Sequence, residues 1–255
     1  MKSRLLIYDI ENMAELGWSW GPHYETSIIH VEHPQHLLSI AWKWLGESKV
    51  HVIALPDYKL YKKDKHSDKA LAEAFWPVID SADIVIGHNS DQFDNKMVNS
   101  MFMRHKMNPP SPYATVDTKK VAKQAGRFAS NKLDDLGETF NIGKKLKHEG
   151  FDLWLGCDRG DPQSWKKMIA YNKQDVRLTE KLYLELRPWV KNHPAMNILD
   201  QKPAACPKCG GEDMRPGKKY RATNANLYQY YRCQSCGASI KARLPEMKLK
   251  PKYVN

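Results

Sequence analysis

Acidic side chains stand in this 255-residue chain at spacings that could support chemistry. Asp9 and Glu11 lie two residues apart at the end of an apolar segment, 4–10, that has the pattern of a β-strand. A two-residue step along a strand puts both carboxylates on the same face of the sheet. Two neighbouring carboxylates repel each other unless a cation lies between them. The pair therefore predicts a divalent metal ion.

Two further places carry acids in comparable settings. Asp94 follows an apolar run, 83–87, that is typical of a strand buried on both faces, and α/β proteins build their sites at the ends of such strands. Tyr171 and Asp175 are four residues apart in a long predicted helix, so they share one helix face. A carboxylate and a phenol on one face can serve a metal and a water together. Taken singly, each has an ordinary explanation as a strand edge, a helix cap or a packing residue.

Four of the five cysteines form two Cys-x-x-Cys pairs, each followed by a glycine. The pairs are Cys206 with Cys209 and Cys233 with Cys236. Four thiolates at this spacing predict a closed tetrahedral Zn²⁺ site of the zinc-ribbon type. A segment of about 50 residues cannot bury enough apolar surface to fold unaided, so we expect the zinc to be structural. The fifth cysteine, Cys157, is expected to be a buried or half-buried thiol.

Strands and helices alternate along the first 190 residues. Alternating and continuous apolar runs predict strands over 4–10, 37–45, 49–55, 83–87 and 114–117. Helical spacing and caps predict helices over 67–80, 93–105, 118–127, 132–140 and 161–191, the last interrupted near Pro188. This pattern indicates an α/β domain on a mixed sheet. We expect a catalytic domain over 1–192, a linker over 193–204, a zinc ribbon over 205–245 and a basic tail over 246–255.

The order and spacing of the acidic places resemble the DEDD superfamily of 3′–5′ exonucleases. The first motif is Asp9-Ile10-Glu11, the second is Asn89-x-x-x-Phe93-Asp94, and the third is Tyr171-x-x-x-Asp175. The tyrosine four residues before the last Asp indicates the tyrosine branch, which includes the proofreading domain of family-B DNA polymerases and similar stand-alone exonucleases. The resemblance covers about residues 4–190 and implies a ribonuclease-H-like fold, with a mixed five-stranded sheet flanked by helices. Asn12 departs from the family, which usually has Thr there.

The resemblance implies a two-metal nuclease. Two Mg²⁺ or Mn²⁺ ions would be held by Asp9, Glu11, Asp94 and Asp175, and Tyr171 would orient the attacking water or the phosphate. The product would be a nucleoside 5′-monophosphate. Further candidates for substrate contact are Met13, Asn89, Phe93, Lys144 and Lys145. For Met13, packing is an equal alternative, for Phe93 a place in the core is favoured, and for the lysines a solvated loop is equally open.

The charge of +11 is concentrated near the C-terminus. Residues from Gln201 onward carry 12 Lys or Arg and 3 acids, which leaves a nearly neutral body. In this region cations alternate with tyrosines, a composition typical of single-strand binding, although a protein-docking module is the alternative. Trp18 and Trp20 could stack on bases, but packing is favoured.

The resemblance therefore implies a metal-dependent 3′–5′ exonuclease for single-stranded nucleic acid, with DNA favoured although the sequence does not distinguish DNA from RNA, and with a zinc ribbon that aids binding. A 3′ exoribonuclease and a catalytically silent nucleic-acid-binding or replisome scaffold are the alternatives. A separate polymerase or another replication protein is a possible partner. No apolar run is long enough to span a membrane, and no secretory signal opens the chain, so a reducing cytoplasmic location is expected.

Overall fold

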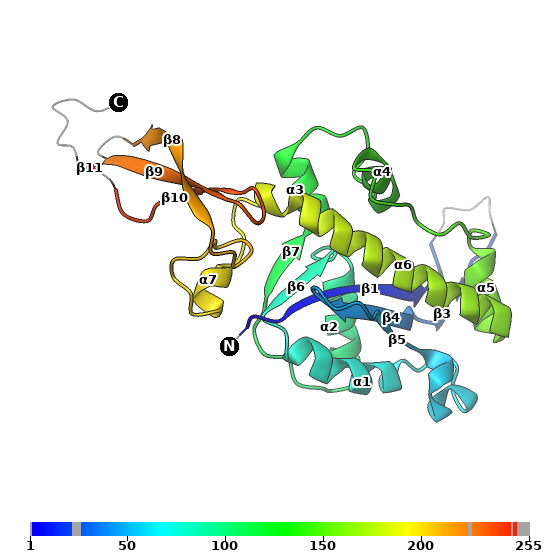
Figure 1. The fold of residues 1–255 in the computed structure, drawn as a ribbon. Helices are drawn as coiled ribbons and strands as arrows, with labels where there is room; N and C mark the ends of the chain where they lie inside the picture. The colour runs from blue at the N-terminus through cyan, green and yellow to red at the C-terminus, as the bar shows by residue number, and fades with distance from the viewer. Residues whose placement is uncertain (1, 22–26, 224–225, 246, 249–255) are drawn as a thin grey trace.

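The fold is seen in a computed structural model that describes residues 2–21, 27–223, 226–245 and 247–248 (Figure 1). Its centre is a five-stranded mixed sheet in the order β5-β4-β1-β6-β7. The strands are β1 (Leu5–Met13), β4 (His36–Trp44), β5 (His51–Ala54), β6 (Ile84–Gly87) and β7 (Ala114–Asp117). β1 runs antiparallel to β4 and parallel to β6, so it occupies the middle of the sheet.

Alternation along β1 separates two hydrophobic cores. Leu6 and Tyr8 point into one core, with side chains of α1 (Lys69–Asp80) and α2 (Asp94–Arg104). Leu5 and Ile7 point into the other, with side chains of α3 (Thr118–Ala125), α4 (Leu133–Thr139) and α6 (Pro162–Leu186). Successive strand residues face opposite sides, which explains this division. The predicted sheet with flanking helices is confirmed.

The structure also contains elements that the sequence did not predict. A small hairpin pairs β2 (Leu16–Trp18) with β3 (His30–His33), and α5 (Asp152–Arg159) packs against α6. The packing expected for Trp18 and Trp20 is wrong, because these side chains are 62% and 80% exposed. Both lie on or beside a two-stranded hairpin, and the described part of the chain leaves them largely uncovered.

Short helical turns complete this domain. They are η1 (Leu55–Asp57), η2 (Lys59–Lys62) and η3 (Arg187–Trp189), the last directly after α6, so the predicted break near Pro188 falls where α6 ends. Cys157 is fully buried as predicted, and burial raises its pKa to about 12, which keeps the thiol neutral.

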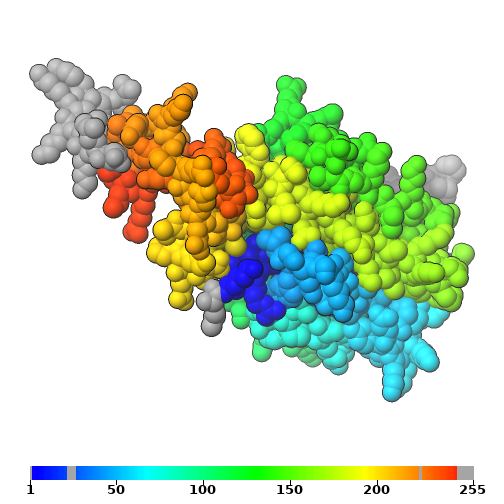
Figure 2. All heavy atoms as spheres, in the orientation of Figure 1, coloured from blue at the N-terminus to red at the C-terminus, as the bar shows by residue number. Residues whose placement is uncertain are grey.

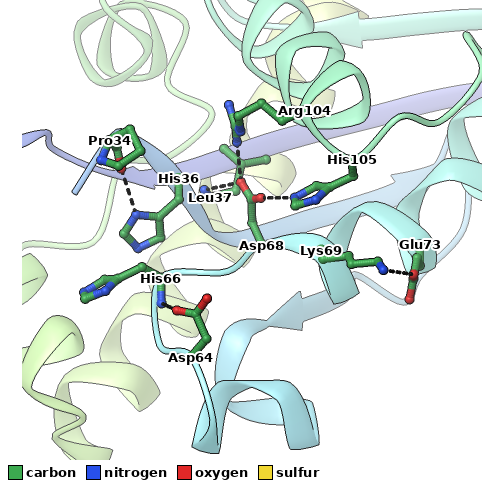
Figure 3. Close-up of polar contacts among 10 residues, drawn as sticks. All are labelled: Pro34, His36, Leu37, Asp64, His66, Asp68, Lys69, Glu73, Arg104 and His105. Atoms are coloured by element: carbon green, nitrogen blue, oxygen red, sulfur yellow. Dashed lines mark hydrogen bonds and ion pairs between the residues drawn. The ribbon is translucent and has the colours of Figure 1, made fainter. Parts of the chain in front are cut away.

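One buried carboxylate joins three elements of the first core (Figure 3). Asp68, directly before α1, accepts hydrogen bonds from the backbone N–H of Leu37 at 3.0 Å, from Arg104 at 2.7 Å and from His105 at 2.7 Å. Leu37 belongs to β4, and Arg104 and His105 mark the end of α2. A buried carboxylate with three partners is satisfied, and it fixes α1 relative to α2 and the sheet.

The C-terminal part is a small antiparallel sheet beside the end of α6 (Figure 1). It comprises β8 (Met214–Ala222), β9 (Asn226–Cys233), β10 (Ser239–Lys241) and β11 (Met247–Lys248). A short helix, α7 (Met196–Leu199), precedes it, within the range proposed as a linker, and the backbone N–H of Met196 donates to the carbonyl of Pro207 at 2.9 Å. Of the basic tail proposed over 246–255, residues 246 and 249–255 lie outside the described residues. Within the described residues, no helix has the length and apolar character needed to cross a membrane.

Candidate metal-binding active site

Three of the four predicted carboxylates meet where β1 passes under α6. Ligand oxygens of Asp9, Glu11 and Asp175 all lie within 4.8 Å of one another. Asp9 and Glu11 project from the same side of β1, and Asp175 is in the middle of α6, where it is 2% exposed. Asp175 Oδ1 is buried and accepts no hydrogen bond from the described residues. Buried carboxylate oxygens with open acceptor capacity are the ligands that Mg²⁺ and Mn²⁺ prefer, so this cluster fits a divalent cation.

Asp94 lies next to this cluster but is not one of the three carboxylates whose oxygens lie within 4.8 Å of one another. It is the first residue of α2, it is 4% exposed, and its Oδ1 accepts a hydrogen bond from the backbone N–H of Ile10 at 3.3 Å. That bond ties Asp94 to the residue between Asp9 and Glu11. Burial is the largest cause that raises the pKa of Asp9, and the charge of Asp94 is the second largest. Asp94 is thus an electrostatic neighbour of the three carboxylates.

The electrostatics of the site favour a bound cation. Burial first, and then the charge of Asp175, raise the pKa of Glu11 to about 8. Burial raises the pKa of Asp94 to about 7, and it also raises the pKa of Asp9 and of Asp175. Because the carboxylates are desolvated and repel each other, their ionised forms are costly without a cation.

Lys145 supplies a positive charge inside the cluster. Its ammonium forms an ion pair with Asp175 and donates a hydrogen bond to the Tyr171 hydroxyl at 2.6 Å. Burial alone would lower the pKa of Lys145, but the charge of Asp175 and these hydrogen bonds raise it. Lys145 was predicted only as a contact for the phosphate backbone, whereas it lies within the acidic cluster. Lys144 instead pairs with Glu138 on the surface.

Tyr171 is held in an aromatic cluster beside the acids. Its ring packs edge-on against His148 at 4.8 Å and Trp154 at 6.4 Å between ring centroids. Trp154 Nε1 donates to the carbonyl of Asn12 at 3.1 Å, which ties this cluster to β1. Burial and Asp175 raise the pKa of Tyr171 to about 12. The phenol is therefore protonated at neutral pH and can donate its hydrogen.

Asn172 was not predicted, although it orients an acidic ligand. Its Nδ2 donates to Asp9 Oδ2 at 2.8 Å, and its Oδ1 accepts from the Ser39 hydroxyl at 3.0 Å. Asn172 and Ser39 are both fully buried. The available signal was weak: Asn172 is a polar residue at a core-facing position of the helix that carries Tyr171 and Asp175.

The loop between β6 and α2 is held by Asp117. The N–H of Asn89 donates to Asp117 Oδ1 at 3.0 Å, and the same carboxylate caps α3. Asn89 has a φ of 66°, a left-handed conformation that asparagine tolerates better than most residues. The core position favoured for Phe93 is wrong, because its side chain is 39% exposed. Met13 is 8% exposed and packs in the first core, which agrees with its packing alternative.

The four ribbon cysteines form a second cluster with the geometry of a zinc site. Cys206 Sγ and Cys236 Sγ are 3.8 Å apart, and Cys209 Sγ and Cys233 Sγ are 3.6 Å apart. Four sulfurs at about 2.3 Å from a tetrahedral Zn²⁺ would be separated by about 3.8 Å. Gly210 and Gly237, one after each pair, have φ values of 71° and 74°. These turns need the left-handed conformation that glycine provides. The cluster can therefore hold a metal ion.

Comparisons with known proteins define the class of this domain. The model of the RNase_H superfamily matches residues 45–187, more than half of the chain, and the chain therefore belongs to that superfamily. The matched residues include Asp94, Tyr171 and Asp175 but begin after β1. In structure, the chain is similar to the family B DNA polymerase from the hyperthermophilic archaeon Pyrobaculum calidifontis, with a TM-score of 0.55 and 18% identity over 81% of the chain. It spans 28% of that polymerase, and at this identity the likeness concerns the fold alone. No curated protein matches the chain in sequence.

Proposed function

We propose that this chain is a metal-dependent 3′–5′ exonuclease of the DEDD type, tyrosine branch, that acts on single-stranded DNA. The observation that carries the proposal is the meeting of three carboxylates, the half-buried Asp9 and the buried Glu11 and Asp175, within 4.8 Å where an RNase H-like sheet packs against α6. Membership of the RNase_H superfamily favours nuclease chemistry on nucleic acid. The order of the motifs and Tyr171 support the 3′–5′ exonuclease class.

The four acids would hold two Mg²⁺ or Mn²⁺ ions, with Asp94 completing the ligand set from the start of α2. Such ions stabilise charge on the reacting phosphate and lower the pKa of a bound water. The protein's part is to hold its carboxylates in the orientation that binds the ions. Asn172 does this for Asp9 through a hydrogen bond from a fully buried amide.

Tyr171 and Lys145 would act on the phosphate and on the attacking water. The Tyr171 phenol keeps its proton at neutral pH and accepts a hydrogen bond from Lys145, so its own hydrogen can orient a water or a phosphate oxygen. Lys145 holds a permanent positive charge where negative charge develops on the phosphate. Hydrolysis of the terminal phosphodiester would release a nucleoside 5′-monophosphate.

The zinc ribbon would aid substrate binding. Its four cysteines would hold one structural Zn²⁺, and its cations and tyrosines would bind the strand outside the active site. The polymerase-like fold supports a role beside a separate polymerase or another replication protein, to which this domain would supply proofreading.

A time course on 5′-labelled single strands tests the proposal. DNA and RNA of equal sequence are incubated with Mg²⁺, with Mn²⁺ and without either ion, beside the Asp9→Ala/Glu11→Ala double variant. The expected result is a ladder that shortens from the 3′ end, faster on DNA, only with metal and only with the unmodified protein. Faster RNA shortening would reassign the substrate. Binding without cleavage by zinc-loaded protein would contradict the proposal and identify a scaffold.

A further inference from the structure

A basic pocket lies between the zinc ribbon and the end of α6. It measures about 420 Å³, and its lining includes Lys191, Lys208, Arg221 and Lys241 but no acidic residue. These cations come from four places in the chain: the segment after η3, the first cysteine pair, strand β8 and strand β10. In Figure 2 the orange and red ribbon abuts the yellow segment that follows α6. The pocket therefore belongs to both parts of the chain.

The cations of this pocket have no acidic side chain beside them in its lining. Among the described residues, none of the four forms an ion pair. Lys208 donates to the carbonyl of Pro188 at 2.6 Å, and Lys241 lies 4.3 Å from the centre of the Tyr228 ring. Lys191 and Arg221 are exposed. Gathered like charges without acids attract a polyanion, because each neutralised phosphate releases a bound counterion.

An exposed indole completes the pocket. Trp189 lines it and is 65% exposed at the end of η3. Cations that bind phosphates, next to an aromatic face that accepts a stacked base, are the means by which single strands are held without sequence preference. A docking site for a protein partner would be expected to be mainly apolar, whereas four cations line this pocket.

We propose that the pocket formed by Trp189, Lys191, Lys208, Arg221 and Lys241 binds the phosphodiester backbone and one base of a single strand, upstream of the 3′ end that is held in the active site. This inference rests on the proposed function. Asp175 lies 11 residues before the end of α6, and η3 follows, so Trp189 is about 22 Å further along the helix axis. At about 3.4 Å per stacked nucleotide, this distance corresponds to about six nucleotides.

Binding of oligothymidylates tests the pocket independently of cleavage. The Asp9→Asn/Glu11→Gln protein, loaded with zinc, is titrated into fluorescein-labelled dT3, dT6, dT9 and dT12, and anisotropy gives the Kd. The pocket variants are Arg221→Glu/Lys241→Glu and Trp189→Ala. The matched control is Lys62→Glu/Lys63→Glu, which makes the same charge change on exposed residues of η2 and its end. Thermal unfolding and zinc content establish that every variant is folded.

The inference predicts how the affinity depends on the length of the oligothymidylate and on the salt concentration. Each lost phosphate contact on a single strand changes affinity by about fivefold at 0.1 M salt, so Arg221→Glu/Lys241→Glu weakens dT12 binding about 25-fold and reduces the salt slope by about 1.4. Trp189→Ala weakens dT12 about tenfold. The parent protein binds more tightly beyond about six nucleotides, and this step is lost in the pocket variants.

Two results would overturn the inference: a pocket variant that binds dT12 no more weakly than the Lys62/Lys63 control, or a parent protein whose affinity shows no step with length. The proposed function is judged separately by cleavage. If the unmodified protein cleaves from the 3′ end while the pocket variants bind as the control does, only the pocket is wrong. If the unmodified protein does not cleave, the exonuclease proposal fails whatever the oligothymidylates show.

Discussion

Replacing Glu11 by glutamine should make the metal-free protein more stable and the metal-loaded protein inactive. Glu11 is 9% exposed, and burial together with the charge of Asp175 raises its pKa to about 8, from an ordinary value of 4.5. The folded protein therefore holds the Glu11 proton more tightly than the unfolded chain does. The contribution of Glu11 to stability is complete below about pH 4.5 and is lost as the pH rises toward 8.

The size of the effect follows from the pKa shift. One pKa unit corresponds to about 1.36 kcal/mol, so ionising Glu11 costs the metal-free fold about 4 kcal/mol at pH 8. Glutamine has nearly the same shape and no charge to desolvate. For a chain of this size, about 4 kcal/mol corresponds to roughly 8–16 °C in the thermal midpoint.

Thermal unfolding in buffer freed of Mg²⁺ and Mn²⁺, with the ribbon zinc retained, measures this between pH 5 and 8. Glu11→Gln should unfold at a higher temperature than the unmodified protein at pH 8, and the gap should close toward pH 5. Added Mg²⁺ should stabilise the unmodified protein more than the variant, because only an intact ligand set gains binding free energy. Glu185→Gln, the same change at an exposed position of α6, should have little effect at any pH. Equal midpoints for Glu11→Gln and the unmodified protein at pH 8 would refute the reasoning that the cluster is destabilised by its own charge.

Three further changes test other parts of the structure. Tyr171→Phe keeps the ring packing but removes a hydrogen-bond donor, so kcat for the 3′ end should fall about 100-fold with little change in thermal midpoint; unchanged kcat would exclude Tyr171 from the reaction. Cys233→Ser removes one thiolate, so metal analysis should find zinc lost and limited proteolysis should degrade the ribbon before the RNase H-like domain. Asp68→Ala leaves Arg104 and two other donors without their partner, and urea unfolding should show a loss of about 3–5 kcal/mol; a loss below about 1 kcal/mol would contradict its structural role.

The sequence predicted those parts of the site that depend on local spacing. Asp9 and Glu11 share a face of β1 because a strand repeats every two residues, and Tyr171 and Asp175 share a face of α6 because a helix repeats near every four. The cysteine cluster was also predicted from local spacing, because the tight turn between the two cysteines of each Cys-x-x-Cys pair brings their thiols together. Long-range contact between these places was supplied by the family resemblance.

The contacts that were missed depend on the tertiary packing of segments without a regular pattern. Lys145 lies in an irregular loop after α4, and only the docking of that loop on α6 brings its ammonium to Asp175. The role of Asn172 could be predicted only by knowing which residues of α6 face β1 and β4. Trp18 and Phe93 were wrongly placed in the interior, because large apolar side chains are usually buried and sequence alone did not reveal their exposed hairpin and loop.

Binding of Mn²⁺ measured beside cleavage tests the central claim most directly, that the carboxylates on β1 and α6 are the metal-dependent active site. Calorimetry of zinc-loaded protein at pH 7 should show Mn²⁺ binding with proton release, because burial raises the pKa of Glu11 to about 8 and of Asp94 to about 7. Cleavage of a 5′-labelled strand should rise over the same Mn²⁺ concentrations, and the Asp9→Asn/Glu11→Gln protein should neither bind nor cleave. Equal Mn²⁺ binding by both proteins, or cleavage that does not follow binding, would contradict the account.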